Sequence, residues 1–502
     1  MKKYISIIAV FFTIGISGCK KDFLSLEVNP NQPSVTTPQL TLSGALATAA
    51  AIINTSNPQD GVWVGYWTPS GNYVPSSTIQ QFQITNTTFT GVWTSLYANL
   101  TNLNNLQVTS AKDASLGNFQ AIAMIMKAYD FQQLVDQFND VPYSQAFQPS
   151  TILFPAYDKG QAIYDDLTKQ LTAAIALINK SSTGVNPGVS DIVFGGNMVG
   201  WKKFANSILL RLAIRQSTKN PGNAAAAALA TTAGEGYLDE NMQASANPGY
   251  SNDAGKQSPF YGTYGVDPNG NPPFNNVYYR ANKFFINLLT ADNDPRLTRV
   301  YAKTSGGGII DGNVFGDAVT TKSNPATSAV GPGLITSYAQ RAVLFSSNES
   351  LFLQAEALAD GYNIIGTPTN PAPTTPTTAQ AAYERGITAS FVNLGLTAGQ
   401  AATYYGQAIN NVGWAASSDK KQAIIYQKYI SMIGYNVLEP YLEYLRTGFP
   451  VLPNPVSIDP AAISPTIPVR QFYPLSEVNS NNTQLAKEGT IDIFTSKIFW
   501  DN

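Results

Sequence analysis

The sequence predicts a mostly α-helical protein in which helical hairpins pack as one unit, interrupted by long irregular loops and a few short strands. Apolar residues recur every three or four positions over much of the chain, as in helices with one buried face. Many of these stretches are paired through short turns and resemble tetratricopeptide-type hairpins, although no strict repeat is visible. No long charged or Ser/Gly-rich linker divides the 502 residues, so we expect residues 37–502 to form a single domain.

The N-terminus has the features of a secretory signal. Residues 1–3 include two lysines and form a basic start. Residues 4–16 are an apolar run that is too short to span a bilayer. Ile16-Ser17-Gly18-Cys19 matches a lipobox, and Cys19 is the only cysteine in the chain. We therefore expect a lipoprotein signal peptide over 1–18, an acylated Cys19 and a lipid-anchored tether over 19–36. The alternative is a plain secretory leader followed by an unused cysteine.

Helices are predicted where the apolar spacing is helical and a start signal comes before it. Thr37 and Pro38 are an N-cap and a first-turn proline, and Ser346 and Glu349 have the spacing of a capping box. Helices are expected over 37–54, 88–108, 116–138, 160–179, 198–217, 223–233, 346–362, 379–393, 398–411 and 420–444. Short extended segments are expected within 305–332, and the chain after Gly448 should be extended, with a short strand over 469–474.

The segment Ile424–Pro450 is expected to be a hairpin of two short helices. Its helical apolar spacing is interrupted near Gly434. The second helix should end at Gly448, because Arg446 would lie in its last turn, the glycine would take a positive φ and Pro450 would prevent continuation.

Two irregular segments, 59–83 and 243–279, are unusually rich in aromatic residues among Gly, Ser, Pro and Asn. Sugars present CH-rich faces and neutral hydroxyls, so a glycan site needs flat rings and amide groups more than ionised acids. We expect the two segments to form one shallow site, with Trp67 and Tyr264 as the leading residues. The ligand-binding candidates are Trp63, Tyr66, Trp67, Tyr73, Tyr261, Tyr264, Phe274 and Tyr278. The alternative is that these rings only cap the core beneath long loops.

Composition excludes several kinds of chemistry. The chain has no histidine, so it lacks Ser-His-Asp and Cys-His arrangements and an ordinary zinc site, and it contains no phosphate-binding glycine motif. The segment 267–271 has only a faint likeness to a calcium loop, because its glycine comes two positions early and no acid follows at position twelve. The pair Asp165 and Asp166 should point in different directions on a helix. We expect no catalytic residue, metal or cofactor, and the net charge of −2 with no basic patch gives no sign of nucleic-acid binding.

Six sequence blocks recur in order along the chain: LVDQFNDVPYSQAF (134–147), WKKFANSILLRLAIR (201–215), DPR (294–296), ESLFLQAEALADGY (349–362), QKYISM (427–432) with YLRTGFPVL (444–452) after a short gap, and VRQFYPLSEVNSN (469–481). Together they resemble the SusD/RagB family of bacterial outer-membrane nutrient-binding lipoproteins. The resemblance also includes the lipobox cysteine and covers nearly all of the expected mature chain.

The resemblance implies a surface-exposed outer-membrane lipoprotein that captures oligosaccharides and passes them to a SusC-like TonB-dependent transporter. It also implies that loop aromatics on the face away from the anchor bind the ligand. Three alternatives remain open: a peptide-capturing homologue, a non-catalytic adhesion or scaffold lipoprotein, and, less favoured, an anchored glycoside hydrolase, which would need two carboxylates about 5 to 10 Å apart in a cleft.

Overall fold

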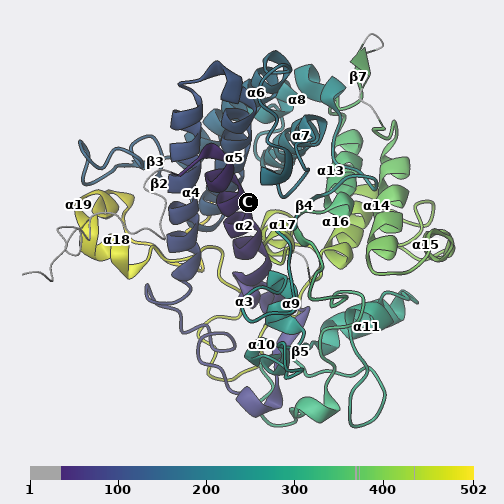
Figure 1. Ribbon diagram of the computed structural model, residues 1–502. Helices are drawn as coiled ribbons and strands as arrows, with labels where there is room; N and C mark the ends of the chain where they lie inside the picture. Colours follow the sequence, from purple (N-terminus) through teal and green to yellow (C-terminus); the bar gives the residue numbers. More distant parts are fainter. Residues whose placement is uncertain (1–35, 368–369, 372–373, 435, 502) are drawn as a thin grey trace, which may run out of the picture.

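The computed structural model describes residues 36–367, 370–371, 374–434 and 436–501 (Figure 1). The expected signal peptide, Cys19 and all of the expected tether except its last residue lie outside these ranges. The longer helices are α2 (Pro38–Thr55), α4 (Gly91–Ser110), α5 (Gly117–Phe138), α6 (Gly160–Lys180), α7 (Met198–Gln216), α8 (Ala224–Thr232), α13 (Ser347–Ala359), α14 (Ala379–Asn393), α15 (Ala398–Tyr405), α16 (Lys420–Ser431) and α17 (Leu438–Thr447).

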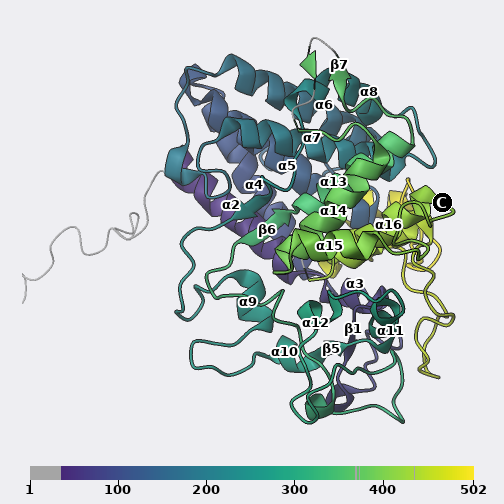
Figure 2. The same cartoon turned by 90° about the vertical axis from the view of Figure 1, so that its right-hand side faces the viewer.

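Consecutive long helices pack against each other as hairpins. Helix α4 packs on α5, α5 on α6, α6 on α7 and α7 on α8, and the same holds for α13 with α14 and α14 with α15. These helices fill the upper part of the molecule and, with α14 and α15, its middle in Figures 1 and 2. The predicted mostly helical class with tetratricopeptide-like hairpins is therefore confirmed.

Helix α2 shows why the sequence could predict these elements. The Thr37 hydroxyl accepts a hydrogen bond from the Leu40 backbone N–H at 3.3 Å, and Pro38 occupies the first turn. Its apolar residues recur at helical spacing and are buried: Leu42, Ala45, Leu46, Ala49, Ile52 and Ile53.

The predicted hairpin at 424–450 consists of α16 and α17. Gly434 has φ +82° between them, and Gly448 has φ +72° directly after α17. Both positions are in the left-handed region that glycine adopts at little cost. The expected break and the expected end of the hairpin are therefore confirmed.

The lower part of the molecule contains short elements within and beside the segments predicted to be irregular (Figure 2). Its short helices are α3 (Pro58–Trp63), α9 (Pro259–Tyr264), α10 (Phe274–Tyr278), α11 (Lys283–Ala291) and α12 (Leu297–Val300). The described strands of the chain pair two by two and antiparallel: β1 (Trp67–Pro69) with β5 (Tyr279–Ala281), β2 (Val141–Pro142) with β3 (Tyr157–Asp158), β4 (Ala244–Ala246) with β6 (Ala342–Phe345), and β7 (Gly366–Thr367) with β8 (Asn370–Pro371).

Some expected elements differ from the structure. The predicted helix over 398–411 ends at Tyr405. No strand forms over 469–474, because Val469 N–H donates to the Ile493 carbonyl while Gln471 N–H donates to the Gln137 carbonyl, so neighbouring residues bond to different parts of the chain. The C-terminal segment is also less extended than expected, since it contains α18 (Leu475–Ser480) and α19 (Asn482–Leu485).

The capping box expected at the start of α13 is only half formed. The Ser346 hydroxyl accepts from the Glu349 backbone N–H at 3.2 Å, as predicted. The Glu349 carboxylate, however, does not turn back to the helix end, and instead accepts from Arg211 Nε at 2.8 Å. The Glu349 side chain therefore forms an ion pair with Arg211 in the core and does not complete the capping box.

Helix α13 joins two groups of buried apolar side chains. Leu353 and Ala357 belong to the large core shared by most long helices, whereas Phe352 and Ala355 belong to a smaller cluster with α14, α15 and α16. In the part of the chain that the structure describes, no helix is both long and apolar enough to cross a membrane.

Candidate functional site

A short antiparallel pairing brings the two aromatic segments together. Strand β1 pairs with β5 in a register that places Pro69 opposite Tyr279, although about two hundred residues separate them in the chain. The single-turn 3-10 helix Gly71–Tyr73 follows β1, and α10 precedes β5. The Ser70 N–H also donates to the Tyr278 carbonyl at 2.8 Å. The chain around Tyr73 is therefore fixed beside α10.

This pairing creates a cluster of three predicted rings, Tyr73, Phe274 and Tyr278. The ring centroids are 5.5 Å apart for Tyr73 and Phe274, 5.3 Å for Tyr73 and Tyr278, and 5.2 Å for Phe274 and Tyr278. Phe274 is 60% exposed and Tyr73 is 37% exposed, whereas Tyr278 is 9% exposed. Tyr278 thus supports two rings that solvent can reach.

Amide side chains surround this aromatic cluster. The side-chain oxygen Asn72 Oδ1 accepts from the Asn324 backbone N–H at 3.1 Å, and the Asn72 backbone N–H donates to the Ser70 hydroxyl at 3.2 Å. On the other side, Asn276 Nδ2 donates to the Gly265 carbonyl at 3.3 Å. These contacts hold the loops that carry the rings, so the rings are presented on a fixed backbone.

The structure corrects the expectation for Trp63, Tyr66 and Trp67. They are 3%, 0% and 5% exposed and belong to the main core. The Tyr66 ring stacks on Tyr429 at 4.7 Å, and Trp67 meets Tyr301 edge to face at 5.3 Å. The segment folds inward because α3 packs on α17. All three rings are therefore buried in the core and do not belong to the exposed aromatic cluster.

Tyr264, the other leading candidate, is half-buried within a row of aromatic rings. Its centroid lies 4.9 Å from that of Phe260 and 6.3 Å from that of Tyr279. Burial raises the pKa of its hydroxyl well above the usual value. Tyr264 therefore supports the loop and does not belong to the exposed cluster.

Tyr261 lines a shallow groove next to α10, with a volume of about 510 Å³. Asn276 belongs to both the groove wall and α10, so the groove lies close to the aromatic cluster. The lining residues are Tyr261, Gly265, Val266, Asn276, Thr298, Tyr301, Ala302, Lys303, Val330, Gly331, Pro332 and Ile335. None of them is acidic, so the groove lacks the pair of carboxylates that a glycosidase needs.

Two residues beside Tyr261, namely Tyr338 and Lys303, were not among the binding residues predicted from the sequence. Tyr338 is 41% exposed, and its ring centroid lies 6.5 Å from that of Tyr261. Lys303 is exposed at the groove wall. No local pattern marks either position, because each reaches the site through a loop that returns from a distant part of the chain.

The acidic groups considered for other chemistry have local partners. Asp267 accepts from the backbone N–H groups of Asn269 and Asn271, both at 2.8 Å, so its carboxylate closes its own turn. Asp165 accepts from Gln161 at 3.1 Å and Asp166 accepts from Tyr143 at 2.5 Å. Within the described ranges no cluster of three or more His, Cys, Asp or Glu could hold a metal ion.

A model of the SusD-like family, described as starch-binding associating with outer membrane, matches residues 30–474. The chain belongs to the SusD-like family. Similar solved structures include a chitin-binding protein with 24% identity, covering 93% of this chain and 100% of its own, at a TM-score of 0.73. A chitin-binding SusD homologue from Flavobacterium johnsoniae has 22% identity, coverages of 92% and 98%, and a TM-score of 0.74. A SusD homologue from Bacteroides fragilis has 21% identity, coverages of 93% and 100%, and a TM-score of 0.72. At these identities the likeness shows a shared fold, and the curated proteins include no match.

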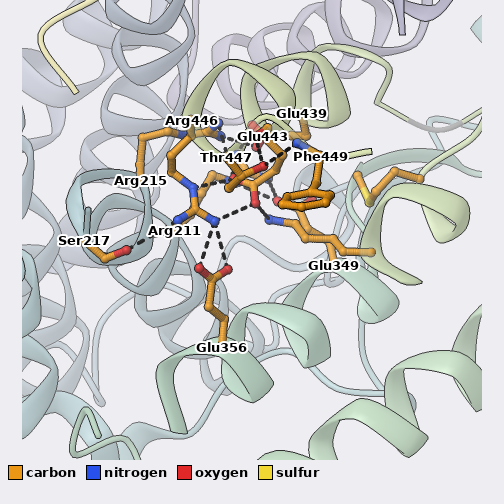
Figure 3. A network of polar contacts seen from close by, with 12 residues as sticks. Arg211, Arg215, Ser217, Glu349, Glu356, Glu439, Glu443, Arg446, Thr447 and Phe449 are labelled. Atoms are coloured by element: carbon orange, nitrogen blue, oxygen red, sulfur yellow. Dashed lines mark hydrogen bonds and ion pairs between the residues drawn. The ribbon is translucent and has the colours of Figure 1, made fainter. Parts of the chain in front are cut away.

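Three of the sequence blocks that resemble the SusD-like family, 201–215, 349–362 and 444–452, contribute residues to a buried network of charges (Figure 3). Helix α7 contributes Arg211 and Arg215, α13 contributes Glu349 and Glu356, and α17 contributes Glu439, Glu443 and Arg446. The side chains of these seven residues are at most 5% exposed. The blocks therefore describe the core of the SusD-like fold.

Ion pairs in this network join the three helices. Arg211 of α7 lies 2.6 Å from Glu349 of α13, and Arg215 of α7 pairs with Glu439 of α17. Arg446 of α17 lies 2.8 Å from Glu356 of α13. Each of these ion pairs thus joins two helices, and removal of Arg211 would take from Glu349 the one ion pair that it makes among the described residues.

The pKa values of the acids differ according to their neighbours. Burial raises the pKa of Glu349 to about 7, although Arg211 opposes the shift. Burial also disfavours the charge of Glu443, but the cations of Arg446, Lys428 and Arg215 together hold its pKa well below the usual value. The four acids of the network, Glu349, Glu356, Glu439 and Glu443, are all buried, so the network offers no acid exposed to a substrate.

Proposed function

We propose that this SusD-like protein captures oligosaccharides at the cell surface through the aromatic cluster of Tyr73, Phe274 and Tyr278. The observation that carries the proposal is the pair of accessible rings, Phe274 and Tyr73, on backbone fixed by β1 and β5. Rings held in this way stack on the CH face of a sugar with little loss of conformational freedom. The neighbouring amides of Asn72 and Asn275 supply donors and acceptors for hydroxyl groups.

The groove lined by Tyr261 extends the proposed site. It contains backbone and amide groups beside Val266 and Ile335, and it is open to solvent along its length. A bound oligosaccharide would place one residue on Phe274 and further residues toward Tyr261. This arrangement favours a chain of several sugars over a single sugar.

The proposed cellular role follows from the family description. The family is described as associating with the outer membrane, and the lipobox at Cys19 would supply the anchor facing the cell exterior. The captured glycan would pass to a SusC-like TonB-dependent transporter in the same membrane. No bond in the glycan is broken, since the groove has no acidic lining residue.

A glycan array tests the proposed activity. Chito-oligosaccharides are the first probes, because two similar structures are chitin-binding proteins, and starch oligosaccharides are the second, because of the family description. We expect binding to at least one oligosaccharide class and intact ligand after long incubation. A peptide array probed in parallel distinguishes glycan capture from the alternative of peptide capture. Binding to peptides alone, or release of shorter sugars by a clean preparation, would contradict the proposal.

A further inference from the structure

A second pocket lies among the long helices, far from the aromatic cluster. It has a volume of about 310 Å³ and is formed by α4, α5, α6 and the segment 143–148. Figures 1 and 2 place these helices in the upper part of the molecule, whereas α10 and β5 lie in the lower part. Ligand pockets usually have volumes of roughly 300–1,000 Å³, so this pocket has room for one small ligand.

Lys127 of α5 places its ammonium group in this pocket among neutral partners. Nζ donates to Asn104 Oδ1 at 2.8 Å and to Gln107 Oε1 at 2.9 Å, both on α4. An ammonium has three N–H groups. In the described chain the third N–H group of Lys127 has no protein acceptor, so it can donate a hydrogen bond to a ligand.

Lys127 has no paired acid, in contrast to the covered lysines Lys203 and Lys428. Lys203 lies 3.0 Å from Asp239, and Lys428 lies 3.4 Å from Glu443. Among the described residues, no carboxylate comes within 4.0 Å of Lys127 Nζ. Asp166, the acid nearest this wall, is engaged by the Tyr143 hydroxyl at 2.5 Å and by Gln170 Nε2 at 3.4 Å.

The electrostatics of the pocket favour an anion. Burial lowers the pKa of Lys127 to about 8, and the charge of Asp166 opposes this shift only in part. A partly desolvated cation without a counter-ion is costly, and a bound carboxylate would relieve that cost.

The other walls of the pocket fit a sugar ring. Phe147 places its ring centroid 5.2 Å from Lys127 Nζ, and Phe131 packs behind it at a centroid distance of 6.0 Å. Gln148, Gln170 and Ser144 line the same space with amide and hydroxyl groups. The pocket thus combines an aromatic face, neutral hydrogen-bonding groups and one cation.

We propose that this pocket binds a single hexuronate, with the carboxylate on Lys127, the ring against Phe147 and the hydroxyls on the surrounding amides. An amino acid fits less well, because its ammonium group would find only Asp166, whose carboxylate is already engaged. The proposal does not depend on the proposed oligosaccharide site, since the two sites share no residue.

Isothermal titration calorimetry of the purified protein with D-glucuronate and D-galacturonate tests the proposal, with D-glucose as the neutral probe. We expect saturable binding of at least one hexuronate at pH 7, at least tenfold tighter than D-glucose. Lys127→Met should weaken that binding at least tenfold. Lys169→Met is the matched control, because Lys169 is an exposed lysine of the neighbouring helix α6, and it should change nothing. Phe274→Ala should also leave hexuronate binding unchanged.

A second measurement needs no variant and so does not depend on whether Lys127→Met folds. The hexuronate affinity of the unmodified protein should fall as the pH rises from 7 to 9.5, because Lys127 loses its proton while the ligand stays ionised. Burial and the neighbouring Asp166 raise the pKa of the Tyr143 hydroxyl well above its usual value, so Tyr143 keeps its proton over this range. Absence of hexuronate binding, equal binding of D-glucose, full affinity in Lys127→Met, or a constant affinity from pH 7 to 9.5 would overturn the proposal.

Discussion

Trp67 and Phe274 are both aromatic residues in segments of little regular structure, yet their surroundings differ completely. Trp67 is 5% exposed and packs on Tyr301, whereas Phe274 is 60% exposed. We expect Trp67→Ala to lower the free energy of unfolding by about 3–5 kcal/mol, the usual cost of emptying a buried aromatic site. Urea denaturation measures the loss. A Trp67→Ala protein as stable as the parent would show that the ring is not part of the core.

Asp130 provides a residue-scale test of pH dependence. Asn99 donates to Asp130 Oδ2 at 2.8 Å, and in the described chain Oδ1 is buried without a hydrogen-bond partner. Burial raises the pKa of Asp130 from 3.8 to about 7. The folded protein therefore binds a proton between pH 4 and 7 that the unfolded chain has released. The stability from this group is present below pH 4 and is lost as the pH rises through 7.

Asp130→Asn should remove this pH dependence. We expect the difference in free energy of unfolding, taken as variant minus parent, to rise by on the order of 4 kcal/mol between pH 4 and pH 8. This follows from 1.36 kcal/mol per pKa unit. Denaturant unfolding of both proteins across this pH range measures the difference. A difference that stays constant from pH 4 to pH 8 would show that Asp130 ionises normally in the fold.

At the scale of single elements, the two positive-φ glycines around α17 differ in their space for a side chain. A Cβ at Gly448 would meet nothing within 4 Å, so Gly448→Ala should cost only the backbone strain of about 1–2 kcal/mol. A Cβ at Gly434 would lie 2.6 Å from Leu334, so Gly434→Ala should cost more. Chemical denaturation of the two variants compares them. Equal losses, or a larger loss at Gly448, would contradict this account of the hairpin.

The same hairpin shows how far the sequence could predict the elements. Apolar spacing and glycine positions predicted α16 and α17 because they depend on residues close together in the chain. The pairing of β1 with β5 depends on contacts between Thr68 and Arg280, which no local pattern reveals. The sequence predicted one shared site with Trp67 and Tyr264 as its leading residues, whereas the structure brings Tyr73 and Phe274 together and turns Trp67 inward.

At the scale of the whole molecule, the sequence blocks that resemble the family and the candidate glycan site lie in different parts of the protein. Arg215 and Arg446 lie in blocks that resemble the family, and both are buried between helices with Glu439 and Glu443, which lie outside the blocks. Charged residues in a sequence are ordinarily assigned to the surface. Only the packing of α7 and α17 shows that these charges neutralise each other in the core, while the ligand-facing rings lie in loops with no motif.

The proposed anchor also concerns the whole molecule. If Cys19 carries the lipid, Cys19→Ala should abolish fatty-acid labelling and move the protein out of the membrane fraction, because acyl chains supply most of the membrane affinity of such a protein. Metabolic labelling with fractionation measures both effects. Lipid labelling that persists in the variant would show that the anchor is elsewhere.

The central claim is that the exposed rings of Phe274 in α10 and of Tyr73 bind the glycan. Calorimetry with matched variants tests this claim most directly. Phe274 and Phe154 are similarly exposed, at 60% and 54%, but Phe154 lies outside the aromatic cluster. With the tightest oligosaccharide found on the array, Phe274→Ala should weaken binding by roughly 1–3 kcal/mol without loss of stability. Phe154→Ala should bind like the parent. Unchanged affinity in Phe274→Ala, or an equal loss in both variants, would contradict the assignment of this surface as the glycan site.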